Sequence, residues 1–126
     1  MSNIKVRGWH VSQKRMYSAE EMATDQLTLL PTGQFINVNG YSTQLSRVFS
    51  KEEFIPLLWT GKLDKNGVEI YEDDSVQRVG VYRVVLRDGG WWLVNSTASF
   101  ALSQYESSAY EVVGDIYTKL KLMPDG

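Results

Sequence analysis

The sequence contains no cysteine and a single histidine, His10. The lack of cysteine excludes disulfides, thiolate nucleophiles, cysteine-ligated zinc and cysteine-ligated iron–sulfur clusters. A metal site made of histidines would need His10 from more than one subunit. The lack of cysteine also suits a reducing cytoplasm, where we expect the protein to act.

Long apolar runs are missing as well. No window approaches the ~18 apolar residues of a membrane-spanning helix. The N-terminal stretch MSNIKVRGWHVSQKRMY has no apolar core of the kind that signal peptides carry. We therefore expect no membrane partner.

A surplus of positive charge is missing too, because 13 Lys and Arg stand against 15 Asp and Glu, for a net charge of −2. Dedicated DNA-binding domains usually carry a clear positive balance, since phosphate neutralisation drives their affinity. Dividing the chain at residue 60 reveals no basic part: six basic residues face five acidic ones before it, and seven face ten after it. Nucleic acid is thus an alternative partner but not the favoured one.

Common catalytic motifs are also absent. The patterns G-x-S-x-G, G-x-x-x-x-G-K-[ST] and G-x-G-x-x-G do not occur. This argues against serine hydrolases, P-loop proteins and dinucleotide-binding proteins. We predict no catalytic residues, no cofactor and no metal ligands, and we expect a protein that is not an enzyme.

What the chain does contain fits one domain over residues 1–126, since 43% of its residues are hydrophobic and it has four Trp and seven Tyr. Alternating apolar residues over 4–10 and a short run over 14–17 predict an N-terminal hairpin. Apolar runs on both sides of Pro31-Thr32-Gly33 predict a second hairpin.

Two stretches have the spacing of a helix capping box. Ser18 precedes Glu21 by three residues, which predicts a short helix. Ser50 and Glu53 repeat the spacing and predict one helical turn over 51–55, which Pro56 limits.

The C-terminal half reads as closely spaced strands joined by tight turns, including Asp88-Gly89-Gly90. The predicted strands are 68–71, 75–79, 81–87, 91–95, 98–104 and 110–117. This spacing predicts a mainly β fold, with an N-terminal hairpin region (1–57) packed on a small β-barrel region (58–120). The expected core comprises Ile4, Val6, Leu58, Ile70, Val76, Val84, Leu86, Leu93, Val113 and Ile116.

The stretch TGKLDKNGVEIYEDDSV, residues 60–76, raises the question of a calcium loop. An EF-hand that starts at Asp64 fails at its fifth, sixth and twelfth positions. Asp64-Lys65-Asn66-Gly67 instead has the composition of a type I turn, with Asp first and Gly last. The stretch therefore predicts a turn between two strands.

Four acids follow this turn: Glu69, Glu72, Asp73 and Asp74. Paired carboxylates can do acid–base work or hold Mg²⁺. Because no nucleophile accompanies them in the sequence, we favour acids that face water and protect a sheet edge. A metal-dependent enzyme built on them is the third alternative.

The best candidate for a binding surface surrounds two adjacent tryptophans. Its residues are Tyr82, Arg83, Arg87, Trp91 and Trp92. Adjacent residues of a strand point to opposite faces, so one tryptophan would be core and the other exposed or at an interface. In the alternative that we favour, both are buried.

Three stretches resemble the YopX family, whose members are small proteins encoded largely by bacteriophages and prophages. Residues 60–76 resemble its signature TGLxDKNGxEIYEGDIV. IKVRGWH with Lys14-Arg15-Met16 resembles its opening IKFRAWD…KxM, and EVVGDIY (111–117) resembles its closing EVIGNIYE. The three stretches occur in the family's order and bracket nearly the whole chain.

The resemblance implies a mostly β protein with a small SH3-like barrel, a phage or prophage origin and self-association. It carries no established activity and no catalytic residues. It also implies a set of fold-specifying positions in the turn region. These are Thr60, Gly61, Asp64, Asn66, Gly67, Ile70, Tyr71 and Asp74.

Within that set, Thr60 and Asp74 are expected to bond backbone groups, and Ile70 and Tyr71 to pack. The chain departs from the family at Asp73, where relatives usually have glycine, and at Gly8, where they have alanine. If the family glycine needs a positive φ, Asp73 tolerates that conformation less well.

Taken together, the sequence predicts a phage- or prophage-derived, non-enzymatic module for binding or assembly in the cytoplasm of a bacterial host. Its expected partners are further copies of itself and a host or phage protein. The alternative is a small β-barrel that binds nucleic acid through the tryptophan surface.

Overall fold

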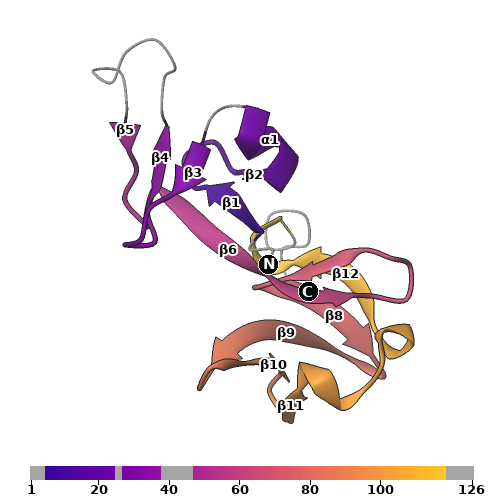
Figure 1. Ribbon diagram of the computed structural model, residues 1–126. Coiled ribbons are helices and arrows are strands. Elements are labelled where there is room, and N and C mark those ends of the chain that lie inside the picture. The colour runs from indigo at the N-terminus through magenta and orange to yellow at the C-terminus, as the bar shows by residue number, and fades with distance from the viewer. Residues whose placement is uncertain (1–4, 25–26, 38–46, 119–126) are drawn as a thin grey trace. The chain divides into compact units, whose positions relative to one another are not determined.

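The computed structural model describes residues 5–24, 27–37 and 47–118 (Figure 1). The elements of its first part are β1 (Val6–His10), β2 (Arg15–Tyr17), α1 (Ala19–Thr24), β3 (Leu27–Leu29), β4 (Phe35–Asn37), β5 (Arg47–Val48) and β6 (Phe54–Leu63). There follow β7 (Glu69–Tyr71), β8 (Asp74–Arg78), β9 (Gly80–Arg87), β10 (Gly90–Val94), β11 (Ser99–Ala101), the 3₁₀ helices η2 (Leu102–Gln104) and η3 (Ser107–Ala109), and β12 (Glu111–Asp115). The prediction of a mainly β fold is confirmed.

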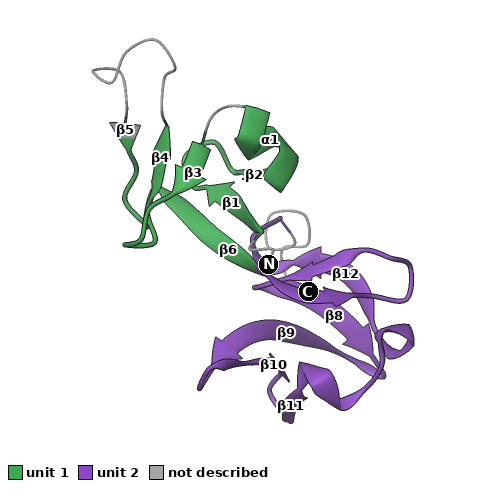
Figure 2. Ribbon diagram, in the orientation of Figure 1, with its two compact units in different colours: residues 1–58 green, residues 59–126 purple. Residues whose placement is uncertain are grey.

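The chain forms two compact units, residues 1–58 and residues 59–126 (Figure 2). Strand β6 contributes to both, since its first half pairs with β1 and its second half pairs with β7. Among the described residues, no helix combines the length and the apolar character needed to cross a membrane.

The first unit begins with the predicted hairpin, in which β1 and β2 pair antiparallel and Gly8 stands opposite Tyr17. Helix α1 follows, and the capping box at its start is confirmed. The Glu21 amide donates to Ser18 Oγ at 3.1 Å, and the Ser18 amide donates to Glu21 Oε1 at 2.9 Å. The second predicted hairpin is also confirmed as the antiparallel pair β3–β4.

The helical turn predicted over 51–55 forms only at its start, where the amides of Glu53 and Phe54 donate to the Ser50 carbonyl at 3.0 and 3.1 Å, and it is wrong for Phe54 and Ile55, which lie in a strand. The reciprocal bonds of a capping box do form, at 2.9 Å from the Ser50 amide to Glu53 Oε1 and at 3.1 Å from the Glu53 amide to Ser50 Oγ. Strand β6 nevertheless begins at Phe54, whose side chain is 1% exposed. Burial of this ring and pairing with β1 outweigh the local helix signal.

An aromatic cluster forms the core of the first unit. Its buried members are Tyr17, Met22, Phe35, Phe49 and Phe54. Phe35 and Phe54 pack edge to face with centroids 4.8 Å apart. A Cβ at Gly8 would lie 2.4 Å from Phe54 Cε1, so the ring occupies the space that an alanine methyl would need.

The second unit is built on an antiparallel sheet with the order β11-β10-β9-β8-β12, which curls into a half-barrel (Figure 1). Asp88 and Gly89 join β9 to β10 with φ of 54° and 79°, which are the two positive values that a tight type I′ hairpin turn requires. The hairpin predicted at Asp88-Gly89-Gly90 is therefore confirmed. The strand predicted over 98–104 is wrong in its second half, because β11 ends at Ala101 and η2 buries Leu102.

The core of this unit contains Ile70, Val76, Val84, Leu93, Leu102 and Tyr110. The predictions for Ile70, Val76, Val84 and Leu93 are thereby confirmed, whereas those for Leu86 and Val113 are wrong, since these side chains are 47% and 41% exposed. Leu86 lies near the end of the β9–β10 hairpin, beyond this cluster, and Val113 lies at a β-bulge in β12. Val6, Leu58 and Ile116 are partly buried, and Ile4 lies outside the described residues.

Candidate functional site

The turn predicted at Asp64–Gly67 joins β6 to β7. Asp64 Oδ1 accepts hydrogen bonds from the amides of Asn66 at 2.8 Å and Val68 at 2.9 Å. The Gly67 amide donates to the Asp64 carbonyl at 3.1 Å, and Gly67 takes a φ of 80°. The turn is therefore held by a carboxylate at its first position and a glycine at its last.

The Asp64 side chain also closes the edge of another strand. Its Oδ2 accepts from the Val112 amide in β12 at 2.8 Å, and the neighbouring Lys65 amide donates to the Tyr110 carbonyl at 2.9 Å. Asp64 is 3% exposed. Burial by itself raises the pKa of Asp64, but the three amide donors outweigh it and hold the pKa below its ordinary value.

The other residues of the turn region also serve the fold. Thr60 Oγ1 donates to the Ile70 carbonyl at 2.8 Å, and the Tyr71 amide donates to Asp74 Oδ2 at 2.8 Å. Ile70 and Tyr71 are 0% and 6% exposed. Gly61 takes a φ of 88° within the irregular stretch of β6 where the register with β7 shifts.

The expectation that the acids after this turn face water is wrong for Asp73 and Asp74, which are 7% and 1% exposed. Their side chains accept bonds from groups that the folded chain brings to them. Glu69 accepts a bond from the Tyr71 hydroxyl at 3.1 Å. Within the described ranges, no three Asp, Glu, His or Cys residues gather as metal ligands.

Asp73 links three parts of the second unit. The Arg83 guanidinium donates to its Oδ1 from Nε at 2.9 Å, and the Tyr117 hydroxyl donates to its Oδ2 at 2.7 Å. Its amide donates to the Val84 carbonyl at 2.8 Å, and its carbonyl accepts from the Ile116 amide at 3.0 Å. Burial, and then the bond to this carboxylate, raise the pKa of Tyr117.

Asp73 takes a φ of 67°, in the left-handed region that glycine enters most easily. Asp73 therefore has a positive φ in this chain, at the position where the resemblance led us to expect glycine. Its carboxylate contacts offset the steric cost of that conformation. The sequence indicated the position but not these contacts, because Arg83 and Tyr117 lie 10 and 44 residues away.

The residues of the predicted tryptophan surface divide between the two faces of the sheet. Trp91 stands opposite Leu86 and Trp92 opposite Val85 in the β9–β10 ladder, so the two indoles point to opposite faces. Tyr82 and Trp91 pack, partly buried, against the core cluster. Trp92 is partly buried on the other face, with the Arg87 guanidinium 4.8 Å from its ring centroid.

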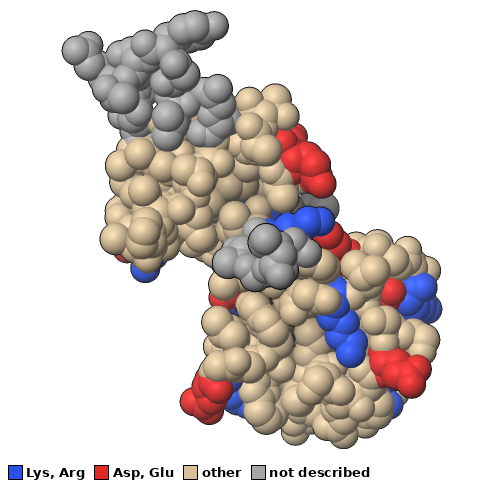
Figure 3. Space-filling model, in the orientation of Figure 1, with Lys and Arg blue, Asp and Glu red and all other residues tan. Residues whose placement is uncertain are grey.

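The face that Trp92 shares is here called the β9–β10 outer face. By strand register it carries Val81, Arg83, Val85, Arg87, Trp92 and Val94. Val81 is 44% exposed. On the side of residues 59–126 seen in Figure 3, Lys and Arg are scattered among Asp and Glu and separated by uncharged surface.

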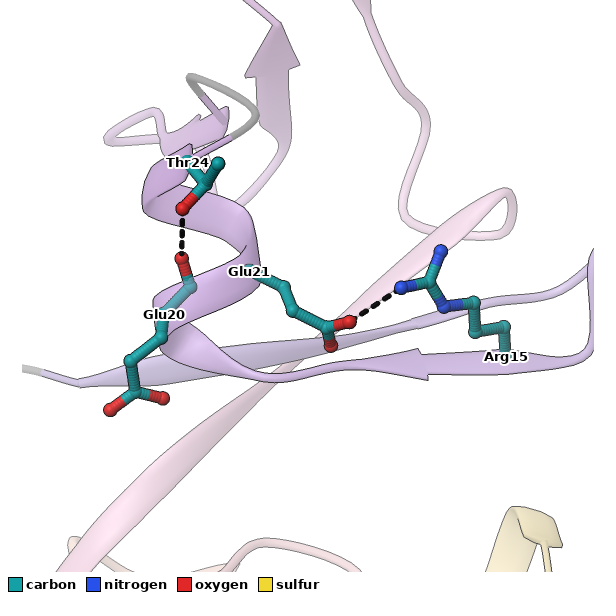
Figure 4. Close-up of a pocket in the computed structure, with 4 residues that line it drawn as sticks. All are labelled: Arg15, Glu20, Glu21 and Thr24. Carbon is teal, nitrogen blue, oxygen red and sulfur yellow. Dashed lines mark hydrogen bonds and ion pairs between the residues drawn. The ribbon is translucent and has the colours of Figure 1, made fainter.

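A hollow of about 290 Å³ lies beside α1 in the first unit, lined by Arg15, Glu20, Glu21 and Thr24 (Figure 4). Arg15 and Glu21 form an ion pair, and Thr24 Oγ1 donates to the Glu20 carbonyl at 3.1 Å. The bonds from the Ser18 amide and from Arg15 lower the pKa of Glu21. Glu21 is thereby kept ionised as a cap and ion-pair partner, which does not suit a general acid.

The fold and the turn region define a small, β-rich protein whose conspicuous carboxylates are mostly structural. The family model described as YopX protein matches residues 5–124. The chain therefore belongs to the YopX family, and the resemblance seen in the sequence is confirmed.

Two solved structures share the fold. Protein EF1440 from Enterococcus faecalis is 21% identical, with a TM-score of 0.63 over 98% of this chain and 99% of that one. Protein yopX from Bacillus subtilis is 19% identical, with a TM-score of 0.62 over 98% of this chain and 97% of that one. A search of curated proteins finds no match.

Proposed function

We propose that the protein is a non-enzymatic binding and assembly module that self-associates. In this proposal it is encoded by a phage or prophage, acts in the cytoplasm of the bacterial host and also contacts a host or phage protein. The observation that carries the proposal is the β9–β10 outer face, where Trp92 lies among valines and beside Arg87.

Apolar side chains on the outer side of a sheet favour a partner. The opposite face of β9 and β10 already covers the core through Val84 and Leu93. Covering Val81, Val85, Trp92 and Val94 removes apolar area from water, which stabilises a contact by roughly 25 cal/mol per Å². Tryptophan and arginine are also enriched among residues that dominate binding energy at interfaces.

The arrangement of the acids gives no support to a metal-dependent enzyme. Asp73 is bound by Arg83 and Tyr117, and Asp74 by the Tyr71 amide. Asp64 holds three backbone amides. These carboxylates satisfy buried donors of the fold, and that role accounts for their burial.

Nucleic acid binding is the second candidate, because the Arg87–Trp92 pair has the chemistry on which a base stacks. Two observations weigh against it. The Asp73 carboxylate neutralises Arg83. The part of the chain after residue 60 carries seven basic residues against ten acidic ones.

Size-exclusion chromatography with light scattering tests self-association. We expect wild-type protein to exceed the 14.4 kDa of one chain, and Trp92→Ser to shift the distribution toward the single chain. Leu63→Ser is the matched control, because Leu63 is 41% exposed in β6, outside the β9–β10 outer face. A wild-type monomer throughout the micromolar range overturns the proposal.

Fluorescence anisotropy with single-stranded DNA and RNA at low salt tests the second candidate. Binding that weakens with added salt and is lost in Trp92→Ser would support it. No binding at tens of micromolar protein rules it out.

A further inference from the structure

The five-stranded sheet of the second unit ends in two edges, β11 on one side and β12 on the other (Figure 1). The β12 edge is covered at its start, because Asp64 Oδ2 accepts from the Val112 amide and the Lys65 amide donates to the Tyr110 carbonyl. No described strand pairs with β11 on its outer side. The two edges therefore differ in what covers them.

The hydrogen-bond pattern shows which β11 groups face outward. The Asn95 amide donates to the Ala98 carbonyl at 2.9 Å and closes the β10–β11 hairpin. Hydrogen-bonded and non-hydrogen-bonded pairs alternate along an antiparallel ladder, so the next hydrogen-bonded pair is Leu93 with Phe100. The amides of Ser99 and Ala101 consequently point away from β10, and no described residue accepts a hydrogen bond from them.

The chemistry of this edge lacks the usual protections. Residues 95–104, NSTASFALSQ, contain no charged residue and no proline. Natural sheets guard exposed edges with charged side chains, proline or bulges. The β12 edge has such guards, since it carries Glu111, Asp115 and a bulge between Val112 and Gly114.

We propose that β11 is the pairing edge for a second copy of this chain. The two β11 strands run antiparallel across a two-fold axis at Phe100, so that Ser99 of each copy stands opposite Ala101 of the other. The outward amides of both copies then find carbonyl acceptors, and two five-stranded sheets become continuous. The inference rests on the self-association proposed above and assigns it a surface.

Three features of β11 fit a second copy. A two-fold contact places a strand against itself, so any charge would meet a like charge or require a partner of opposite sign. The uncharged β11 avoids this conflict. Ser99 and Ala101 are also small, so the Ser99 side chain of one copy and the Ala101 side chain of the other can stand opposite each other on one face without a clash.

The third feature is continuity with the β9–β10 outer face. Trp92 stands beside Ala101 and Val94 beside Ser99 in the β10–β11 register. Pairing at β11 therefore joins the β9–β10 outer faces of the two copies into one sheet surface, with the small side chains of Ser99 and Ala101 between them.

The decisive variant is Ala101→Pro. Ala101 has φ −69° and ψ 139°, a backbone conformation that proline adopts. Its amide points away from β10, so the substitution removes no bond from the β10–β11 ladder. The residue before it, Phe100, is in a strand, which a pre-proline position favours. Ala101→Ser keeps the outward amide and is the matched control.

Light scattering, with circular dichroism as a check on folding, measures the outcome. We expect wild type and Ala101→Ser to have the same mass, and folded Ala101→Pro to have half of it. Folded Ala101→Pro with the wild-type mass overturns the β11 assignment but leaves self-association standing. A monomeric wild type overturns both.

Ser99→Lys keeps the test decisive if Ala101→Pro does not fold. Ser99 is exposed, so the fold tolerates the longer side chain, and lysine on an edge strand opposes pairing. Folded Ser99→Lys must also halve the mass. A Ser99→Lys variant with the wild-type mass overturns the assignment in the same way.

Discussion

Asp64 shows how one side chain serves two distant parts of the fold. Its carboxylate holds its own turn through Asn66 and Val68 and the edge of β12 through Val112. Folding lowers the pKa of Asp64. The ionised carboxylate therefore stabilises the folded state fully at pH values above the ordinary aspartate pKa, which is about 4. That contribution is lost as the pH falls through the lower folded pKa.

We therefore expect Asp64→Asn to lower the free energy of unfolding by about 1–3 kcal/mol at neutral pH, because an amide cannot accept all three backbone donors. The difference in the free energy of unfolding between wild type and Asp64→Asn should shrink below about pH 4, where the wild-type carboxylate becomes protonated. Urea unfolding from pH 7 to acid measures it, with Asp88→Asn in the exposed β9–β10 turn as control. A difference that stays constant over this range would contradict the linkage.

Asp73 combines a left-handed backbone with a bound carboxylate. Asp73→Ala loses the bonds to Arg83 and Tyr117 and keeps a Cβ at φ 67°. Asp73→Gly loses the same bonds but relieves the backbone. We expect both variants to be less stable than wild type, and alanine to be worse than glycine by about 1 kcal/mol.

Chemical denaturation of the two Asp73 variants separates the two effects. The alanine–glycine difference reports the backbone, and the glycine–wild-type difference reports the carboxylate contacts. Equal stability of the alanine and glycine variants would show that the positive φ carries no strain. A glycine variant as stable as wild type would show that the contacts contribute nothing.

At the scale of elements, the turn of the β8–β9 hairpin contains a strained residue. Among the described residues, Val79 is the only β-branched one with a φ in the left-handed region. Arg78 pairs with Gly80, so Val79 alone turns the chain, with φ 64° and a side chain that is 94% exposed. A β-branched residue is strained in this region, and its exposed side chain gains little from packing. The hairpin therefore tolerates Val79 at the expense of stability.

We expect Val79→Gly to raise the free energy of unfolding by about 1 kcal/mol, because glycine enters the left-handed region without steric conflict. Val81→Gly, in the adjoining strand and outside the positive-φ region, should lower it. Thermal and urea unfolding of both variants give the signs. A destabilised Val79→Gly would mean that the valine side chain makes a contact in the assembled protein.

Elements could be predicted where the signal lies within a few residues. The Ser18–Glu21 box, the Asp64–Gly67 turn and the Asp88–Gly89 turn form as expected, because each uses bonds or backbone preferences inside its own segment. The Ser50–Glu53 box shows the limit. Its local bonds form, yet burial of Phe54 makes the following residues a strand.

At the scale of the whole molecule, the net charge is −2 and the proposed pairing edge is uncharged. Association through the uncharged β11 edge should therefore respond weakly to salt. We expect the mass to stay constant as salt rises from about 50 to about 200 mM, a range over which phosphate binding weakens strongly. Light scattering across this series checks it, and dissociation with added salt would point to ion pairs instead.

The sequence by itself determined the β-rich class, the turns and the family, because strand alternation, capping boxes and glycine positions act over short distances. The tertiary structure decided which acids are buried, since the donors to Asp64 and Asp73 include Val112 and Tyr117, 48 and 44 residues away. It also decided that Asp64 and Lys65 bond the start of the β12 edge, whereas no described strand pairs with the outer side of β11. Sheet order creates edges, and that order depends on pairing between distant segments that no local pattern encodes.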